Sequence, residues 1–130
     1  MLNYQTSISD HYERIQRGTS TLLPEQYIIF NMRTGTVVMK FHRDLILGRN
    51  GKNKACNFVD LSRFDALGAG VSRQHVYISR NTEGQILVGD MGSSNGTYLN
   101  EDRLLPDKLY PMDSGDVLRL GTMIIHIQFE

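Results

Sequence analysis

Residues 90–100 read DMGSSNGTYLN, and this stretch indicates the fold more clearly than any other part of the chain. Its side chains are small and rich in hydroxyl and amide groups, and its glycine and asparagine residues tolerate the left-handed backbone of tight turns. The stretch therefore predicts a rigid polar loop between two strands. Taken alone, it is more typical of an ordinary hairpin loop than of a functional site.

Short runs of β-branched and aromatic residues lie on both sides of this loop and are separated by turn residues. Such runs at roughly 8–12-residue spacing predict an all-β sandwich. Short connections at residues 34–35 and 82–84 predict antiparallel hairpins. The predicted strands are residues 27–33, 37–41, 45–48, 57–60, 75–80, 86–89, 97–99, 117–120 and 123–129.

Two of these runs, residues 76–79 and 125–129, alternate apolar and polar side chains. Successive side chains of a strand point to opposite faces. We therefore expect each of the two strands to bury one face in the core and to expose the other to solvent.

Three segments break the strand pattern most strongly, namely residues 50–54, 64–73 and 90–96. Loops held by a rigid sandwich carry binding and catalytic residues more often than its strands do. Gly48-Arg49 precedes the first segment, and the motif Ser72-Arg73-Gln74-His75 follows the second. These segments are the candidates for a functional site.

Four motifs in order are similar to those of the forkhead-associated (FHA) domain family. They are Gly48-Arg49, Ser-Arg-x-His at 72–75, Gly-Ser-Ser-Asn-Gly-Thr-x-Leu-Asn at 92–100, and Gly-Asp-x-Leu-x-Leu-Gly at 115–121. The resemblance covers residues 27–130. It implies an FHA-type (SMAD/FHA-like) β-sandwich of about eleven mostly antiparallel strands with binding loops at one end. The residues predict nine strands, so two further short ones are expected near 102–105 and 108–110.

The resemblance also implies a site for a phosphothreonine peptide. Arg49 and Ser72 would hold the phosphate, and Ser94 would add a hydroxyl bond. Asn95 would hold the peptide main chain, and Arg73 would lie against the peptide. Phosphate carries about −1.5 to −2 charges and three acceptor oxygens, which suit the planar, permanently charged fork of arginine. The asparagine amide can donate and accept at once, as pairing with a peptide main chain requires.

Four further residues are expected to support the binding loops: Gly48, His75, Gly96 and Thr97. Ser72 and His75 together also invite a serine-hydrolase interpretation. We reject it, because no partner acid stands in a recognisable relation to them and no Gly-x-Ser-x-Gly motif is present. No catalytic residue is therefore predicted.

The composition excludes several classes of function. Fourteen basic residues balance fourteen acidic ones, which argues against nonspecific nucleic-acid or membrane binding. The single cysteine, Cys56, cannot form an internal disulfide, and the scattered histidines give no metal-binding spacing. No apolar run is long enough to span a membrane. We expect a cytoplasmic protein that needs neither a cofactor nor a metal.

The chain is expected to divide into a polar tail, residues 1–24, and a domain, residues 25–130. Tyr4, Ile8, Tyr12 and Ile15 are spaced for one face of a short helix, and residues 18–24 are typical of a linker. The tail also contains Thr6, Thr19 and Thr21. One hypothesis is that a phosphorylated tail threonine occupies the domain's own site and blocks partner binding.

The resulting expectation is a phosphothreonine-dependent signalling adaptor whose partner is a Ser/Thr kinase or a kinase substrate, in a bacterial setting. The alternative is a phosphate-independent scaffold of the same fold that binds a partner through its sheet surface.

Two departures from the family pattern stand out: the long separation between Arg49 and Ser72, and Glu101 where glycine is common. The segment between Arg49 and Ser72 contains three cations, which either add local positive charge or are simply solvated: Lys52, Lys54 and Arg63.

Overall fold

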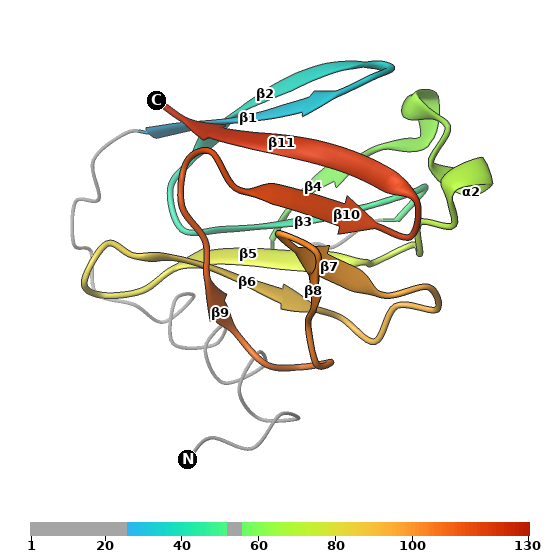
Figure 1. Cartoon of the computed structure of the whole chain (residues 1–130). Coiled ribbons are helices and arrows are strands. Elements are labelled where there is room, and N and C mark those ends of the chain that lie inside the picture. Colours follow the sequence, from blue (N-terminus) through green and yellow to red (C-terminus); the bar gives the residue numbers. More distant parts are fainter. Residues whose placement is uncertain (1–25, 52–55) are drawn as a thin grey trace.

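The computed structural model describes residues 26–51 and 56–130, which form eleven strands, a 3₁₀ turn and one short helix (Figure 1). The predicted sandwich of about eleven strands is confirmed. Residues 1–24, with the expected helix and linker, lie outside the described residues, as do Lys52 and Lys54. The elements are β1 Gln26–Met32, β2 Gly35–Phe41, β3 Asp44–Gly48, β4 Asn57–Asp60, η1 Ser62–Phe64, α2 Ala66–Ala69, β5 Val76–Arg80, β6 Ile86–Asp90, β7 Thr97–Leu99, β8 Asp102–Arg103, β9 Tyr110–Pro111, β10 Val117–Leu120 and β11 Met123–Phe129.

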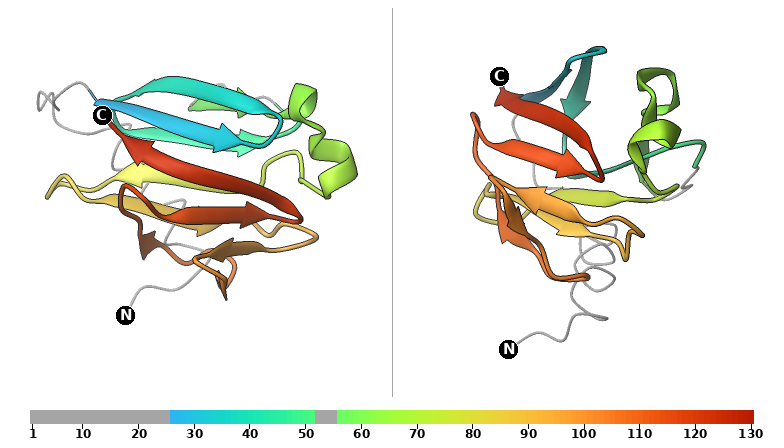
Figure 2. Two further views of the ribbon diagram at one scale, coloured as in Figure 1. Left: turned by 45° about the horizontal axis from the view of Figure 1, so that its top comes forward. Right: turned by 45° about the vertical axis from the view of Figure 1, so that its right-hand side comes forward.

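The strands form two sheets that pack face to face (Figure 2). One sheet has the order β2-β1-β11-β10-β7-β8 and the other the order β4-β3-β5-β6-β9. Neighbouring strands pair antiparallel, as predicted, except that β3 and β4 run parallel. The β1–β2 and β5–β6 hairpins form at the two predicted short connections.

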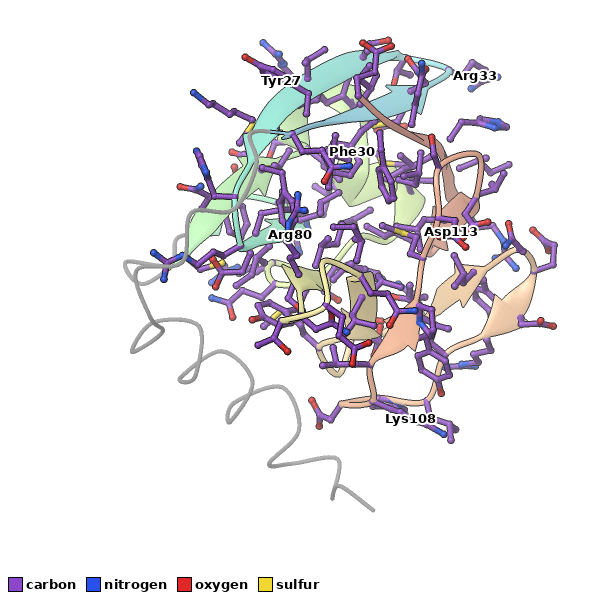
Figure 3. All side chains as sticks on the ribbon, turned by 90° about the vertical axis from the view of Figure 1, so that its left-hand side faces the viewer. Tyr27, Phe30, Arg33, Arg80, Lys108 and Asp113 are labelled. Carbon is purple, nitrogen blue, oxygen red and sulfur yellow. The ribbon has the colours of Figure 1, made fainter. Side chains whose placement is uncertain are left out.

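The core lies between the two sheets and follows from the alternation of side chains. Along β11, Met123, Ile125 and Ile127 are buried, whereas the residues between them are exposed. Phe30 of β1 is fully buried among these side chains, and Figure 3 places it inside the molecule while Arg33 projects from the β1–β2 turn. Burying such side chains contributes about 1.5–3 kcal/mol each and stabilises the scaffold that carries the loops.

The expectation that β5 buries only one face is wrong, because all five residues of the strand are buried. Tyr77 lies on the outer face of its sheet, next to Ile46, and the two form a second small apolar cluster. The side chains packed against this pair come from neighbouring strands and loops: Cys56, Phe58, Met91 and Leu109. The outer face of the central strand is therefore covered.

The segment between β4 and β5 is anchored in the core rather than looping free. Four of its apolar side chains are buried: Leu61, Phe64, Ala66 and Val71. The backbone N–H of Thr122, in the β10–β11 turn, donates to the carbonyl of Ala69 at 2.9 Å. These contacts anchor residues 61–71 to the sandwich. Ser72, which follows directly, is therefore held at the same end of the molecule.

Candidate functional site

The described parts of the three segments singled out in the sequence meet at one end of the sandwich. The helix α2, the β6–β7 loop and the β10–β11 turn lie at the same end in Figure 1. Hydrogen bonds connect residues 49, 70–75 and 90–97 across this end. Four of the predicted site residues, Arg49, Ser72, Ser94 and Asn95, therefore lie in one contiguous group of loops.

Arg49 directly follows β3 and is partly buried. Its backbone N–H donates to the carbonyl of Ser72 at 3.2 Å, and its side-chain Nε donates to the carbonyl of Val71 at 2.8 Å. Within the described part of the chain, its two terminal nitrogens form no hydrogen bond. The guanidinium is thus held at one nitrogen and presents its other N–H groups outward.

Gly48, just before Arg49, is required by close backbone packing. A Cβ atom placed on Gly48 would lie 1.9 Å from the carbonyl oxygen of Arg73. No side chain fits there, so the end of β3 and the Ser72-Arg73 backbone approach each other only because residue 48 is glycine. This approach places Ser72 beside Arg49.

Ser72 connects to the β6–β7 loop through its side chain. Its Oγ accepts a hydrogen bond from the backbone N–H of Ser94 at 3.1 Å, which leaves the hydroxyl hydrogen free to donate. The side chain of Ser94 is exposed beside it. Arg73 is also exposed, and its side chain forms no hydrogen bond with the described residues. The side chains of Ser72, Arg73 and Ser94 therefore keep donors that no described residue uses, and Ser72 is the neighbour of Arg49.

His75 is fully buried beneath these residues. Its Nδ1 accepts a hydrogen bond from the backbone N–H of Ser72 at 3.0 Å, so Nδ1 carries no hydrogen and the ring is neutral. Its Nε2 carries the hydrogen and donates to the carbonyl of Gly96 at 3.0 Å. Burial lowers the pKa of His75, against the opposing effects of the Gly96 carbonyl and the charge of Asp90. One neutral imidazole therefore joins the Ser72 segment to the β6–β7 loop.

Asp90 organises the β6–β7 loop, although it is not among the residues predicted from the sequence. Its Oδ2 accepts the backbone N–H groups of Gly92 at 3.0 Å and Ser93 at 3.1 Å. Its Oδ1 accepts the hydroxyls of Ser93 at 2.5 Å and Thr97 at 2.7 Å. Thr97 is thereby fixed at the start of β7. The signal was an aspartate two residues before a glycine, the pattern of an Asx turn.

Asn95 lies at the tip of this loop and is exposed. Its Nδ2 donates to the carbonyl of Gly70 at 3.0 Å, which ties the loop to the segment after α2. Gly96, the next residue, adopts a positive φ of 85° that favours glycine. The amide oxygen of Asn95 and its second N–H remain available to a ligand.

Asp60 holds Asn50, the residue that follows Arg49. The backbone N–H of Asn50 and that of Ser62 each donate to Asp60 Oδ1 at 3.0 Å. Hydrogen bonds, chiefly from the Ser62 hydroxyl, lower the pKa of Asp60. Arg63 is one of the three cations for which added charge at the site or simple solvation was left open, and its guanidinium stacks 5.0 Å from the ring centroid of Phe64.

A concavity of about 620 Å³ lies at the same end of the sandwich but apart from these residues. It is lined by the β1–β2 turn, α2 and the β10–β11 turn, and none of the predicted site residues borders it. Among the described residues, no three His, Cys, Asp or Glu side chains gather as metal ligands. The helices described are also too short to cross a membrane.

The fold and these loops define a β-sandwich with an arginine, two serines and an asparagine grouped at one end. A model of the FHA domain family matches residues 45–121, more than half of the sequence, so the chain belongs to the FHA domain family.

The chain is also similar to known proteins and solved structures. E3 ubiquitin-protein ligase RNF8 of Bos taurus is 43% identical over 51 residues, which is 39% of this chain but only 10% of that protein. The solution structure of an FHA domain from an Arabidopsis thaliana hypothetical protein is 28% identical with a TM-score of 0.60, covering 86% of this chain and 92% of that one. The N-terminal FHA domain of S. cerevisiae Rad53p, in complex with a phosphothreonine peptide, is 20% identical with a TM-score of 0.61, covering 82% and 94%.

Proposed function

We propose that the chain is a phosphothreonine-dependent interaction module that binds phosphorylated partner peptides through Arg49, Ser72, Arg73, Ser94 and Asn95. The observation that carries this proposal is the hydrogen bonding of the Arg49 side chain. Its Nε is fixed on the carbonyl of Val71 at 2.8 Å, and its terminal nitrogens have no partner among the described residues. A guanidinium held in this way presents N–H donors in a fixed orientation, at a low entropic cost of binding.

The hydroxyls beside Arg49 suit the other phosphate oxygens. Ser72 accepts the Ser94 N–H and keeps its own hydrogen to donate, while the Ser94 hydroxyl is exposed next to it. A phosphate with about −1.5 to −2 charges and three acceptor oxygens would receive bonds from these donors and from the guanidinium. In this role Arg49 supplies most of the charge, and the serines orient the group.

Asn95 would hold the main chain of the peptide. Its Nδ2 is already positioned by the carbonyl of Gly70, so the amide plane is fixed before the peptide arrives. The amide oxygen would accept a peptide N–H, and the second Nδ2 hydrogen would donate to a peptide carbonyl. Arg73, exposed next to Ser72, would contact a side chain of the peptide.

The hydrogen bonds of His75 support binding rather than catalysis. A serine hydrolase needs its histidine to accept the serine hydroxyl hydrogen. Here Nδ1 faces the backbone N–H of Ser72 and Nε2 is engaged by the carbonyl of Gly96, so neither nitrogen serves the Ser72 hydroxyl. The ligase activity named for RNF8 belongs to a protein of which this chain matches a tenth.

The partner is expected to be a protein that carries a phosphothreonine, such as a Ser/Thr kinase or its substrate. The Rad53p domain, which shares this fold, was solved with a phosphothreonine peptide, and FHA domains are among the modules that read phosphorylated motifs through arginines. The cytoplasmic and bacterial setting and the self-inhibiting tail phosphothreonine remain predictions.

The second candidate is a phosphate-independent scaffold, and one observation favours it. The outer side of the six-stranded sheet exposes Tyr27, Val38 and Ile124, which are 43%, 57% and 50% exposed. Exposed apolar side chains on one sheet are one source of protein-binding surface. The two candidates therefore use different faces of the same molecule.

An NMR titration with a degenerate phosphothreonine peptide library separates these candidates. If the proposal holds, the backbone amide signals of Ser72, Ser94 and Asn95 shift, while those of Val38 and Ile124 stay. Unphosphorylated and phosphoserine libraries serve as controls and should move the loop signals little. Shifts confined to the sheet face, or equal shifts with and without phosphate, would replace the reader proposal with the scaffold.

A further inference from the structure

Three side chains of the six-stranded sheet form a cross-strand row on the face directed away from the core. Arg119 of β10 pairs with Tyr98 of β7, and Tyr98 pairs with Arg103 of β8. Leu118 and Leu120, the neighbours of Arg119 along the strand, are buried. Because side chains alternate along a strand, the row lies on the outer face. We call these three residues the arginine–tyrosine row.

Both guanidinium groups of the row stack on one tyrosine ring. The Cζ atom of Arg119 lies 3.8 Å from the ring centroid of Tyr98, and that of Arg103 lies 5.8 Å from it. Both distances are within the roughly 6 Å range of cation–π attraction. Stacking restricts the rotamers of the two arginines, so a bound anion would cost less side-chain entropy than it would with free arginines.

The row carries more positive charge than its surroundings neutralise. Arg119 Nη1 donates to the carbonyl of Gly121 at 2.9 Å, and Nη2 lies 3.6 Å from Glu101 Oε2, whose side chain is 74% exposed. Arg103 is exposed and forms no ion pair in the part of the chain that the structure describes. The two guanidinium groups lie on either side of one tyrosine and repel each other, so an anion beside the row is electrostatically favoured.

The row begins next to the proposed peptide site. A Cβ atom placed on Gly96 would lie 3.2 Å from Nε of Arg103, so this guanidinium lies against the backbone of Gly96. Gly96 directly follows Asn95, the proposed anchor of the peptide main chain. Strands β7 and β8 continue from this loop along the sheet (Figure 1). A peptide that leaves Asn95 in this direction meets Arg103 first.

We propose that the arginine–tyrosine row binds an anionic side chain of the same partner peptide, either a carboxylate or a second phosphate. This inference rests on the proposed function and deepens it, because it names acidic phosphopeptides as the preferred partners. An extended peptide advances about 3.3 Å per residue, so a peptide anchored at Asn95 passes Gly96 and Arg103 within a few residues of the phosphothreonine.

Glu101 separates this role from a purely structural one. If the row only packs the β7–β8 hairpin, removing the Glu101 charge leaves peptide affinity unchanged. If the row binds anions, Glu101 competes for Arg119, and Glu101→Gln strengthens the binding of acidic phosphopeptides. Because this variant gains affinity, its effect cannot be mistaken for a loss of folding.

The experiment measures dissociation constants for phosphothreonine peptides that carry alanine, aspartate or phosphoserine at each of the positions two to four residues away, on both sides. At one position, aspartate or phosphoserine should strengthen binding by about threefold to fivefold relative to alanine. Arg103→Gln should abolish this gain while the alanine peptide binds as before. Arg63→Gln, which removes an arginine stacked on Phe64, is the matched control and should change nothing.

The outcomes separate the two proposals. If every phosphothreonine peptide fails to bind, the proposed function and this inference fall together. If the alanine peptide binds and neither anion adds affinity, or if Arg103→Gln keeps the gain, the inference is overturned while the proposed function stands. A larger gain with phosphoserine than with aspartate would identify a second phosphate as the ligand, and the reverse would identify a carboxylate.

Discussion

The backbone N–H of Ser72 donates to Nδ1 of His75 at 3.0 Å, and this bond ties the serine of the proposed phosphate site to a fully buried, neutral imidazole. The opposite ring nitrogen, Nε2, holds the carbonyl of Gly96 at 3.0 Å. The relative position of the two halves of the site thus depends on the protonation state of one histidine. A proton on Nδ1 would remove the acceptor that orients Ser72.

The first prediction concerns pH. Burial lowers the pKa of His75 below its ordinary 6.5, so the unfolded chain takes up the proton first as the pH falls. The contribution of neutral His75 to the free energy of unfolding is complete above pH 6.5. It is lost as the pH falls toward the folded-state pKa, at no more than about 1.4 kcal/mol per pH unit. Urea unfolding at pH 7, 6 and 5 should show this loss in the wild type and a flatter profile in His75→Asn. Parallel profiles would contradict it.

The second prediction concerns Asp90→Ala. The substitution leaves two backbone N–H groups and two hydroxyls of the β6–β7 loop without their acceptor, so we expect the free energy of unfolding to fall by about 2–4 kcal/mol. Glu83→Ala in the exposed β5–β6 turn is the control, with a change within about 0.5 kcal/mol. Equal stability of the two variants in chemical denaturation would show that Asp90 does not organise the loop.

The third prediction concerns Gly48→Ala. The added methyl group would lie 1.9 Å from the Arg73 carbonyl oxygen, so the two backbones must separate, at a cost of about 3 kcal/mol. Gly84→Ala is the matched control, because Gly84 has a φ of 80° with no atom within 4 Å of the new methyl group and should cost only about 1 kcal/mol. Thermal unfolding of both variants tests the difference, and a Gly48→Ala protein as stable as the control would refute the close approach.

The fourth prediction concerns Asp44→Asn. Burial raises the pKa of Asp44 to about 6, although the Cys56 hydrogen bond and the charge of Arg43 oppose the shift. The contribution of protonated Asp44 to the free energy of unfolding is therefore complete below about pH 3.8, and it is lost as the pH rises through 6. We expect Asp44→Asn to raise the free energy of unfolding at pH 7 by about 1–2 kcal/mol and to add little at pH 4. A variant that is less stable than the wild type at pH 7 would contradict this.

The strands with clear side-chain patterns were predictable from the sequence. The alternation along residues 125–129 corresponds to the observed burial of β11, and the hairpin turns form where the turn residues are. Strands β8 and β9 have two residues each, which is too short for any periodicity, and only the family resemblance indicated them. The burial of both faces of β5 depends on side chains from other strands and loops, which a local pattern does not reveal.

In the candidate site, too, local sequence predicted some features, whereas others depend on contacts between distant residues. The sequence motifs identified the residue types, but the contacts that bring them together span long separations, such as Arg49 to Val71 and Asn95 to Gly70. Asp90 stood at the start of the most informative stretch and was missed, because its role is visible only when its four donors converge on it. The arginine–tyrosine row was also missed, because it depends on strand pairing.

The central claim is that Arg49 makes binding depend on phosphate, and calorimetric titration of one peptide in its phosphothreonine and threonine forms tests it most directly. The wild type and Arg33→Gln, a control in the exposed β1–β2 turn (Figure 3), should bind only the phosphothreonine form. Arg49→Gln should lose at least about tenfold in affinity, the equivalent of about 1.4 kcal/mol, while remaining folded. Equal affinity of Arg49→Gln and the wild type for the phosphothreonine peptide would contradict the account.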